Sequence, residues 1–241
     1  MYTTKNTAVK FFYMRIAVIG SGIMGSGIAC HFANIGIEVL LLDIAPSELN
    51  ELEKNSGLEI SNKKVKNRIV NEMFNRCLKS KPSPIYNKKF ITRVKLGNID
   101  DDLHLISKCE WVIEVVTEKL SVKRSIFEKI EKYRKKGSLI TSNTSGIPIS
   151  FMNEDRTEDF KKHFAVTHFF NPPRYLKLFE IIPGPNCESS VIDFLHDFGE
   201  RFLGKVSIIA KDTPGFIGNR IGMFGMSNIL NMVQELSLIH I

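Results

Sequence analysis

Hydrophobic residues gather in short runs that alternate with longer, more polar stretches along the chain. The short runs are rich in β-branched residues and almost continuously apolar, which is typical of strands buried on both faces. Eight segments have this character: RIAVIG (15–20), EVLLLD (38–43), ITRVKL (91–96), WVIEVV (111–116), SLITSN (138–143), FAVTHF (164–169), LFEIIP (178–183) and KVSIIA (205–210). Strands separated by helix-length segments predict an α/β fold with a doubly wound, mainly parallel sheet.

The segment between the second and third expected strands, residues 44–90, is long, charged and compatible with helix. Pro46 suits a first helical turn, whereas Pro82 and Pro84 mark where a helix has to end. We therefore expect a helical insertion, in the form of an extra pair of helices. A further helix is expected over 122–136, where apolar residues recur at helical spacing.

The pattern changes after Lys211, because residues 212–215 (DTPG) have turn chemistry and no strand-like alternation follows. We expect three parts: an N-terminal extension over 1–13, an α/β domain over 14–211 that contains all the expected strands, and the beginning of a C-terminal all-α domain over 212–241. The last part is expected to be incomplete, because LSLIHI (236–241) gives no helix stop signal.

Composition favours a globular enzyme, with 43% hydrophobic and 24% charged residues and no apolar run of membrane-spanning length. Lys and Arg exceed Asp and Glu by 33 − 26 = 7, and the basic residues are spread through helical stretches such as 63–68. This charge fits either a solvated helix face or attraction for a phosphorylated coenzyme. No helix-turn-helix, zinc or RNA-binding signature is present, so no nucleic acid partner is expected.

The four cysteines, Cys30, Cys77, Cys109 and Cys187, lie far apart and have neither C-x-x-C nor metal-ligand spacing. They are expected to be reduced thiols, with no metal bound. The apolar patch before Arg15 is too short for the core of a signal peptide. A cytoplasmic location is therefore expected.

Three glycines follow the first expected strand in the spacing G-x-G-x-x-G, at Gly20, Gly22 and Gly25. The first permits a tight turn, the second lets the backbone approach a pyrophosphate, and the third lets helix and strand pack closely. The helix that opens there offers free N–H groups to phosphates. Glycine-rich turns are common, so this Rossmann-type signature alone is weak.

Asp43 strengthens the signature, because it ends the second strand 18 residues after Gly25. A carboxylate at that position can accept both ribose hydroxyls of a dinucleotide. It would also repel the extra phosphate of NADP, and no Arg follows it closely. The sequence therefore predicts NAD as cofactor, against the alternative that Asp43 is a turn cap.

Polar residues at the ends of later strands provide candidate chemistry: Ser142 to Ser145 (SNTS), Thr167 to Pro172 (THFFNP) and Glu180. Strand carboxyl ends border the ligand crevice of a parallel sheet, and a histidine near a carboxylate can act as an oriented general base. Each of these residues also has a simpler, purely structural interpretation. His168 could be a core histidine, Glu180 a surface strand residue and Ser145 a helix N-cap.

Six segments together give the chain a specific resemblance: GSGIMGSGIA (20–29), TEKLSVK (117–123), SNTS (142–145), HFFNPP (168–173), FEIIPG (179–184) and KDTPGFIGNR (211–220). In these the chain resembles the L-3-hydroxyacyl-CoA dehydrogenase family over roughly residues 14–235. The combination of HFFNP with DTPGFIxNR is its most specific part.

The resemblance implies roles for individual residues. His168 would be the proton-accepting base with Glu180 as its partner, and Ser145 and Asn219 would hold the substrate's C3 oxygen. The implied NAD contacts, besides the three glycines, are Met24, Asp43, Val116, Glu118, Lys123, Ser145 and Asn171. The helical insertion would contact acyl-CoA through Ser61 and through Arg68, which stands where the family has Lys.

The implied function is reversible hydride transfer between the C3 hydroxyl of an L-3-hydroxyacyl-CoA and NAD, in fatty-acid β-oxidation or butyrate-type metabolism. The parent protein would be a homodimer or part of a multifunctional β-oxidation enzyme. Two alternatives stay open: an NAD-dependent dehydrogenase of a free hydroxy acid, and an inactive nucleotide-binding fragment.

Overall fold

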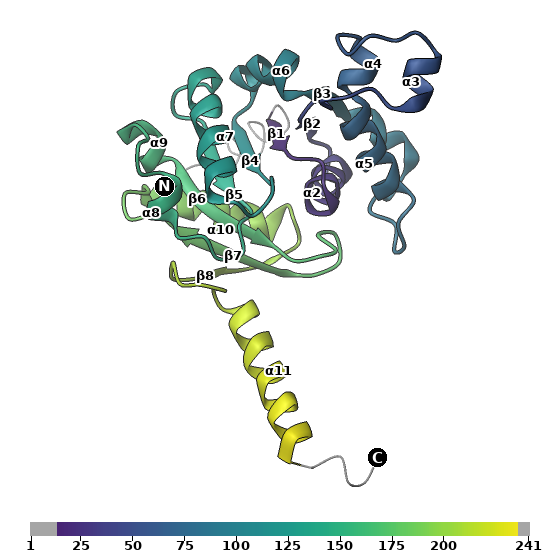
Figure 1. Cartoon of the computed structure of the whole chain (residues 1–241). Coiled ribbons are helices and arrows are strands. Elements are labelled where there is room, and N and C mark those ends of the chain that lie inside the picture. The colour runs from purple at the N-terminus through teal and green to yellow at the C-terminus, as the bar shows by residue number, and fades with distance from the viewer. Residues whose placement is uncertain (1–13, 236–241) are drawn as a thin grey trace.

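A computed structural model describes residues 14–235, and these form one eight-stranded sheet covered by helices on both faces (Figure 1). The strand order is β3-β2-β1-β4-β5-β6-β7-β8. The strands are β1 (Arg15–Ile19), β2 (Glu38–Asp43), β3 (Val94–Asn98), β4 (Trp111–Glu114), β5 (Leu139–Ser142), β6 (Phe164–Phe169), β7 (Leu178–Pro183) and β8 (Val206–Ile209). All neighbours pair in parallel except β6 and β7. The predicted doubly wound, mainly parallel sheet is confirmed.

Each face of the sheet has its own apolar core. One face packs on α2 (Ile23–Asn34), α5 (Arg68–Leu78) and α10 (Ser189–Arg201), and the other on α6 (Ile99–Asp102), η2 (Leu103–Lys108), α7 (Leu120–Tyr133), α8 (Ile149–Met152) and α9 (Glu158–Lys162). Trp111 anchors the first core, with its ring 5.4 Å from that of Phe32 and 5.7 Å from that of Phe198. Because both faces are buried, the strands carry no polar alternation.

The third strand and the helix after β4 are displaced from their predicted positions. Residues expected to be strand from Ile91 instead lie in η1 (Lys88–Arg93), a 3₁₀ helix whose first turn is capped by the Asn87 side chain. The strand begins at Val94 and continues to Asn98, paired with β2. The helix expected over 122–136 begins and ends earlier, as α7.

The insertion over 44–90 is helical, but the expected helical pair is wrong. It contains α3 (Glu51–Asn55), α4 (Lys63–Lys66) and α5, and only α5 has more than five residues. Asn50 and Glu53 cap the start of α3 reciprocally. A single residue, Asn67, separates α4 from α5, so that the two do not form one continuous helix. The Asn67 side chain accepts a hydrogen bond from the Asn98 side chain.

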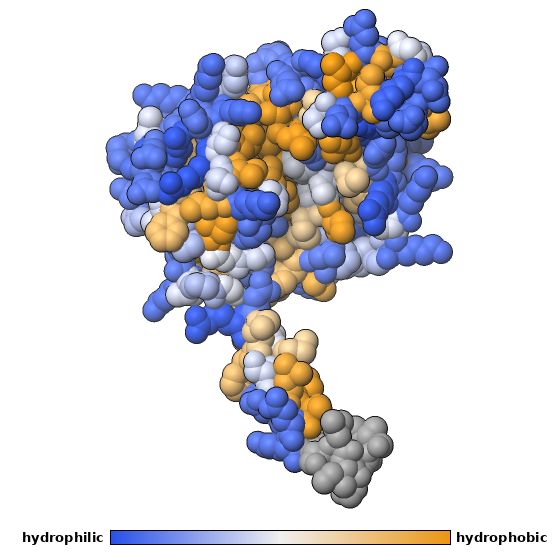
Figure 2. Space-filling model, viewed as in Figure 1, coloured by the Kyte–Doolittle hydropathy of each residue, from blue (hydrophilic) through white to orange (hydrophobic). Residues whose placement is uncertain are grey.

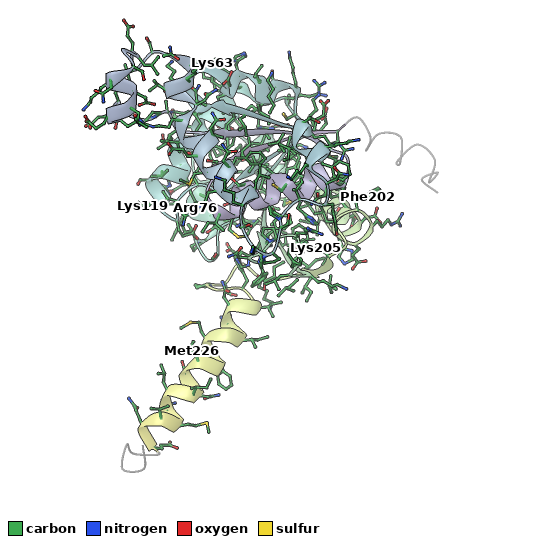
Figure 3. The ribbon with its side chains drawn as sticks, turned by 90° about the vertical axis from the view of Figure 1, so that its right-hand side faces the viewer. Lys63, Arg76, Lys119, Phe202, Lys205 and Met226 are labelled. Atoms are coloured by element: carbon green, nitrogen blue, oxygen red, sulfur yellow. The ribbon has the colours of Figure 1, made fainter. Side chains whose placement is uncertain are left out.

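The last described helix, α11 (Gly218–Glu235), extends away from the sheet (Figure 1). None of its residues is buried, and Met226 points into solvent in Figure 3. The space-filling view shows apolar side chains exposed along it (Figure 2). The predictions for residues 1–13 and 236–241 concern parts of the chain outside the described residues.

Candidate active site

The glycine-rich turn connects β1 to α2 at the carboxyl edge of the sheet. Gly20 has φ +106°, and a Cβ there would lie 2.5 Å from the Val115 carbonyl oxygen. A Cβ on Gly25 would lie 1.8 Å from the Gly20 oxygen, whereas a Cβ on Gly22 would meet nothing within 4 Å. Gly20 and Gly25 are therefore required by packing, and Gly22 leaves open space at the start of α2, which fits a pyrophosphate.

Asp43 lies at the end of β2 beside this turn. Its Oδ2 accepts hydrogen bonds from the Ser21 backbone N–H (2.6 Å) and hydroxyl (2.5 Å), and its Oδ1 accepts one from the Ile44 N–H at 2.7 Å. A cavity of about 540 Å³ is lined by this carboxylate, Gly22 and Val116. Its size and its carboxylate fit the adenosine half of a dinucleotide.

A buried ion pair lies at the end of β4. Lys123 Nζ is 2.7 Å from Glu114 Oε1, and their side chains are 1% and 0% exposed. Glu114 also accepts two further hydrogen bonds, one from the Ser142 hydroxyl at 2.5 Å and one from the Val116 N–H at 2.7 Å. Burial raises the pKa of the Glu114 carboxyl, although the ammonium of Lys123 opposes it.

Glu114 is not among the site residues predicted from the sequence. The signal was available, because a glutamate inside the apolar run WVIEVV cannot be buried without a cationic or hydrogen-bonding partner.

Glu118 links this ion pair to the loop after β5. Its carboxylate lies 3.3 Å from Lys123 Nζ, and accepts hydrogen bonds from the Thr144 hydroxyl and, at 3.0 Å, from the Ser145 N–H. Partial burial raises the pKa of Glu118, but these bonds and the Lys123 charge outweigh it, so that pKa lies below its usual value. Glu118 and Lys123, both expected at the cofactor, are thus placed together, with Lys123 enclosed between two carboxylates.

Ser145, His168 and Glu180 form a chain of hydrogen-bonded side chains. The antiparallel register of β6 and β7 sets His168 opposite Glu180, and Nδ1 lies 2.7 Å from Glu180 Oε2. The Ser145 Oγ lies 3.2 Å from Nε2. Because an ionised carboxylate can only accept, this bond favours the tautomer with hydrogen on Nδ1 and a free lone pair on Nε2. His168 is 4% exposed and Glu180 is fully buried.

The other oxygen of Glu180 is bound by the chain that enters α11. Oε1 accepts hydrogen bonds from the N–H groups of Ile217 (2.9 Å) and Gly218 (2.7 Å). Asn219 follows in the first turn of α11 and is half-buried. The segment expected to hold the substrate oxygen therefore begins beside the histidine–glutamate pair.

Met24 is half-buried in the first turn of α2, and Asn171 is exposed three residues after His168. Asn143, which was not selected as a site residue, accepts the N–H of Phe169 at 2.9 Å and so fixes the end of β6. Asn171 also lines a second cavity, of about 270 Å³, between α2 and α5. Three cations, Arg76, Lys81 and Arg174, line this mostly apolar space.

The two residues expected to contact acyl-CoA lie in the insertion, where both have partners. Ser61 is exposed and donates to Glu59 at 3.2 Å. Arg68 is ion-paired with Glu53 and donates to the Glu48 carbonyl at 2.8 Å. These bonds explain Arg68 as a residue that fixes α5 to the loop before α3.

Within residues 14–235, no group of three or more His, Cys, Asp or Glu side chains is arranged to hold a metal ion. No described helix is long and apolar enough to cross a membrane.

The curated relatives of this chain include proteins described as 3-hydroxyacyl-CoA dehydrogenases. The chain is 48% identical over 222 residues to a probable 3-hydroxyacyl-CoA dehydrogenase of Bacillus subtilis, covering 92% of this chain and 28% of that protein. It is 38% identical to a Deinococcus radiodurans protein of the same description, covering 93% and 61%. The chain thus spans less than two thirds of these relatives.

Solved structures agree with this. The 3-hydroxybutyryl-CoA dehydrogenase of Escherichia coli superposes with a TM-score of 0.69 at 27% identity, covering 92% of this chain and 43% of that one. The (S)-3-hydroxybutyryl-CoA dehydrogenase of Ralstonia eutropha gives 0.68 at 25% identity, covering 94% and 73%.

The family model described as the NAD binding domain of 3-hydroxyacyl-CoA dehydrogenase matches residues 15–213. That range begins at β1 and ends just after β8, and so contains the whole sheet. The chain therefore belongs to the 3-hydroxyacyl-CoA dehydrogenase family, of which it carries the NAD-binding domain.

Proposed function

We propose that this chain is the NAD-binding part of an enzyme that interconverts L-3-hydroxyacyl-CoA and 3-oxoacyl-CoA. The observation that carries the proposal is the line Ser145, His168, Glu180 at the same sheet edge as the dinucleotide turn. A general base next to a hydride acceptor is what oxidation of an alcohol requires.

The residues divide the reaction between them. When bound, NAD supplies the hydride acceptor, held by Gly22 and Asp43 with Met24, Val116, Glu118 and Asn171. His168 accepts the C3 hydroxyl proton at Nε2, while Glu180 holds the ring and stabilises the imidazolium. Ser145 and Asn219 donate to the C3 oxygen as charge develops on it. In the reverse direction His168 returns the proton.

The cavity lined by Arg76, Lys81 and Arg174 supports a thioester of coenzyme A as substrate. Its three cations suit the phosphates of coenzyme A, and its apolar surface suits the pantetheine chain. Asn171, which also lines the cavity, is three residues after His168. Ser61 and Arg68 remain secondary candidates, because Arg68 already has two acceptors.

The decisive experiment is NADH oxidation by the whole chain with acetoacetyl-CoA, beside free acetoacetate. We expect turnover with the thioester alone. Equal turnover of the free acid would favour a hydroxy-acid dehydrogenase, and no turnover with either, despite NADH binding, would favour a nucleotide-binding fragment.

The CoA cavity is tested by Arg76→Ala, with Lys79→Ala as control, because Lys79 lies at the end of the same helix but outside the lining. Loss of one charged phosphate contact should raise KM for acetoacetyl-CoA about tenfold and leave kcat unchanged. An equal response of the two variants would argue against this cavity.

The parent protein is proposed to act in β-oxidation, since two Rickettsia relatives, 38% and 39% identical, are described as putative fatty acid oxidation complex trifunctional enzymes. The parent protein is proposed to be either part of such a multifunctional enzyme or a homodimer. Residues 212–241 are proposed to begin an all-α domain. Four thiols without disulfides support a reducing, cytoplasmic location.

A further inference from the structure

Glu180 has no exposure to water, so its charge depends on the donors around it. One oxygen faces His168, and the other accepts two backbone N–H groups, from Ile217 and Gly218. These N–H groups open an 18-residue helix, whose dipole places partial positive charge at the same end. The start of α11 therefore stabilises the negative charge of the carboxylate that orients the histidine.

Gly218 makes this approach possible. A Cβ on Gly218 would lie 2.7 Å from Phe170 Cζ and 3.1 Å from Leu178 Cδ2. The ring of Phe170 in turn lies edge-on to the imidazole of His168, with centroids 4.5 Å apart. The absence of a side chain at Gly218 thus lets helix, phenyl ring and imidazole pack together.

Phe216 fixes the same turn from the other side. It is 2% exposed, lies 5.5 Å from the His168 ring, and has φ +45°, an unfavourable conformation for a non-glycine residue. Burial against the sheet holds it there. From Gly218 to Glu235 no residue is buried, so these contacts at the first turn attach α11 to the sheet (Figures 1 and 3).

We infer that the turn Phe216–Gly218 of this chain is a positioning element for the His168–Glu180 pair, acting through the backbone N–H groups of Ile217 and Gly218. The turn saturates Glu180 Oε1, which leaves Oε2 to hold Nδ1 and keeps Nε2 directed at Ser145. This inference rests on the proposed dehydrogenase role of the His168–Glu180 pair. Displacement of α11 would then alter proton transfer without altering the part of the dinucleotide site around Gly22 and Asp43, which lies at the ends of β1 and β2.

Gly218→Ala tests this, with Gly222→Ala as matched control. Both glycines lie in α11, but a Cβ on Gly222 meets nothing within 4 Å. We expect Gly218→Ala to lower kcat with acetoacetyl-CoA 10- to 100-fold and to change NADH affinity less than twofold. The downfield proton resonance of the His168 Nδ1–H, measured by NMR on the whole chain, should shift or broaden in this variant alone.

Phe170→Leu added to Gly218→Ala should restore the resonance and part of kcat, because it removes the ring that the new methyl group meets. The double variant also serves if Gly218→Ala does not fold. The inference is overturned if Gly218→Ala matches Gly222→Ala in kcat and in the resonance, or if NADH affinity falls in parallel with kcat. A wild-type chain that lacks turnover would count against the proposed function, and the resonance would still decide this inference.

Discussion

Two buried pairs of a carboxylate and a base lie at the sheet: Glu114 of β4 with Lys123 of α7, and Glu180 of β7 with His168 of β6. Both have a nitrogen–oxygen distance of 2.7 Å, and both lie where strands border the crevice. Lys123 is enclosed by Glu114 and Glu118, whereas the free nitrogen of His168 faces Ser145. The same distance therefore serves two different purposes.

The difference lies in what the base can do. A buried lysine held by two carboxylates is a fixed charge, and its removal would leave those carboxylates unpaired. A histidine held at Nδ1 keeps the lone pair of Nε2 free to accept a proton. The first pair supports the loops that form the site, and the second is placed to react.

The largest effect expected from breaking this comparison is on turnover. His168→Gln keeps a polar side chain of similar size but removes the base, so kcat should fall about 10²- to 10⁴-fold. NADH affinity, followed by energy transfer from the single tryptophan, Trp111, should stay the same. Undiminished turnover would contradict the assigned role.

Glu114→Gln should act on stability. Lys123 would keep a single carboxylate partner, Glu118, whose side chain is 47% exposed, and the free energy of unfolding should fall by about 3–5 kcal/mol. Denaturant unfolding followed by Trp111 fluorescence measures this. Adding Lys123→Met should recover part of the loss, and a stable single variant would mean that the pair is not structural.

Asp43→Ala sharpens the comparison with a carboxylate that belongs to neither pair. It removes the acceptor proposed for the ribose hydroxyls, worth about 1.5–3 kcal/mol for a charged hydrogen bond, or roughly 10- to 100-fold in the Kd for NADH. Because Asp43 also accepts hydrogen bonds from the buried Ser21, the free energy of unfolding should fall by about 1–3 kcal/mol as well. Unchanged NADH affinity would place the adenosine elsewhere.

Lys205 is a third buried base and provides the smallest effect. It is 5% exposed, it donates to the carbonyls of Pro173 and Leu176, and burial lowers its pKa from 10.5 to about 8. Between pH 8 and 10.5 the unfolded chain binds this proton more tightly, so the free energy of unfolding should rise with pH.

Relative to Lys205→Met, the wild-type gain in unfolding free energy over this range should be about 1–2 kcal/mol. The neighbouring His31, whose pKa burial lowers to about 4, stays neutral throughout this range. Parallel pH profiles of the two proteins would show that Lys205 is not the titrating group.

The strands and the dinucleotide turn could be predicted from sequence, because a buried parallel strand needs a continuous apolar run and Gly20 needs its backbone freedom. The third strand was misplaced since Ile91 and Val94 are both β-branched, and side-chain capping by Asn87 decides between them. The link from Glu180 to Ile217 and Gly218 could not be predicted, because it joins backbone groups to a residue 37 and 38 positions away.

The antiparallel pairing of β6 with β7 has a consequence for how members of this family can diverge. Because the ladder sets His168 opposite Glu180, the loop between the strands can gain or lose residues without separating the two side chains. That loop also supplies Asn171 and Arg174 to the second cavity. Changes in loop length can therefore reshape the second cavity while the contact between His168 and Glu180 is retained.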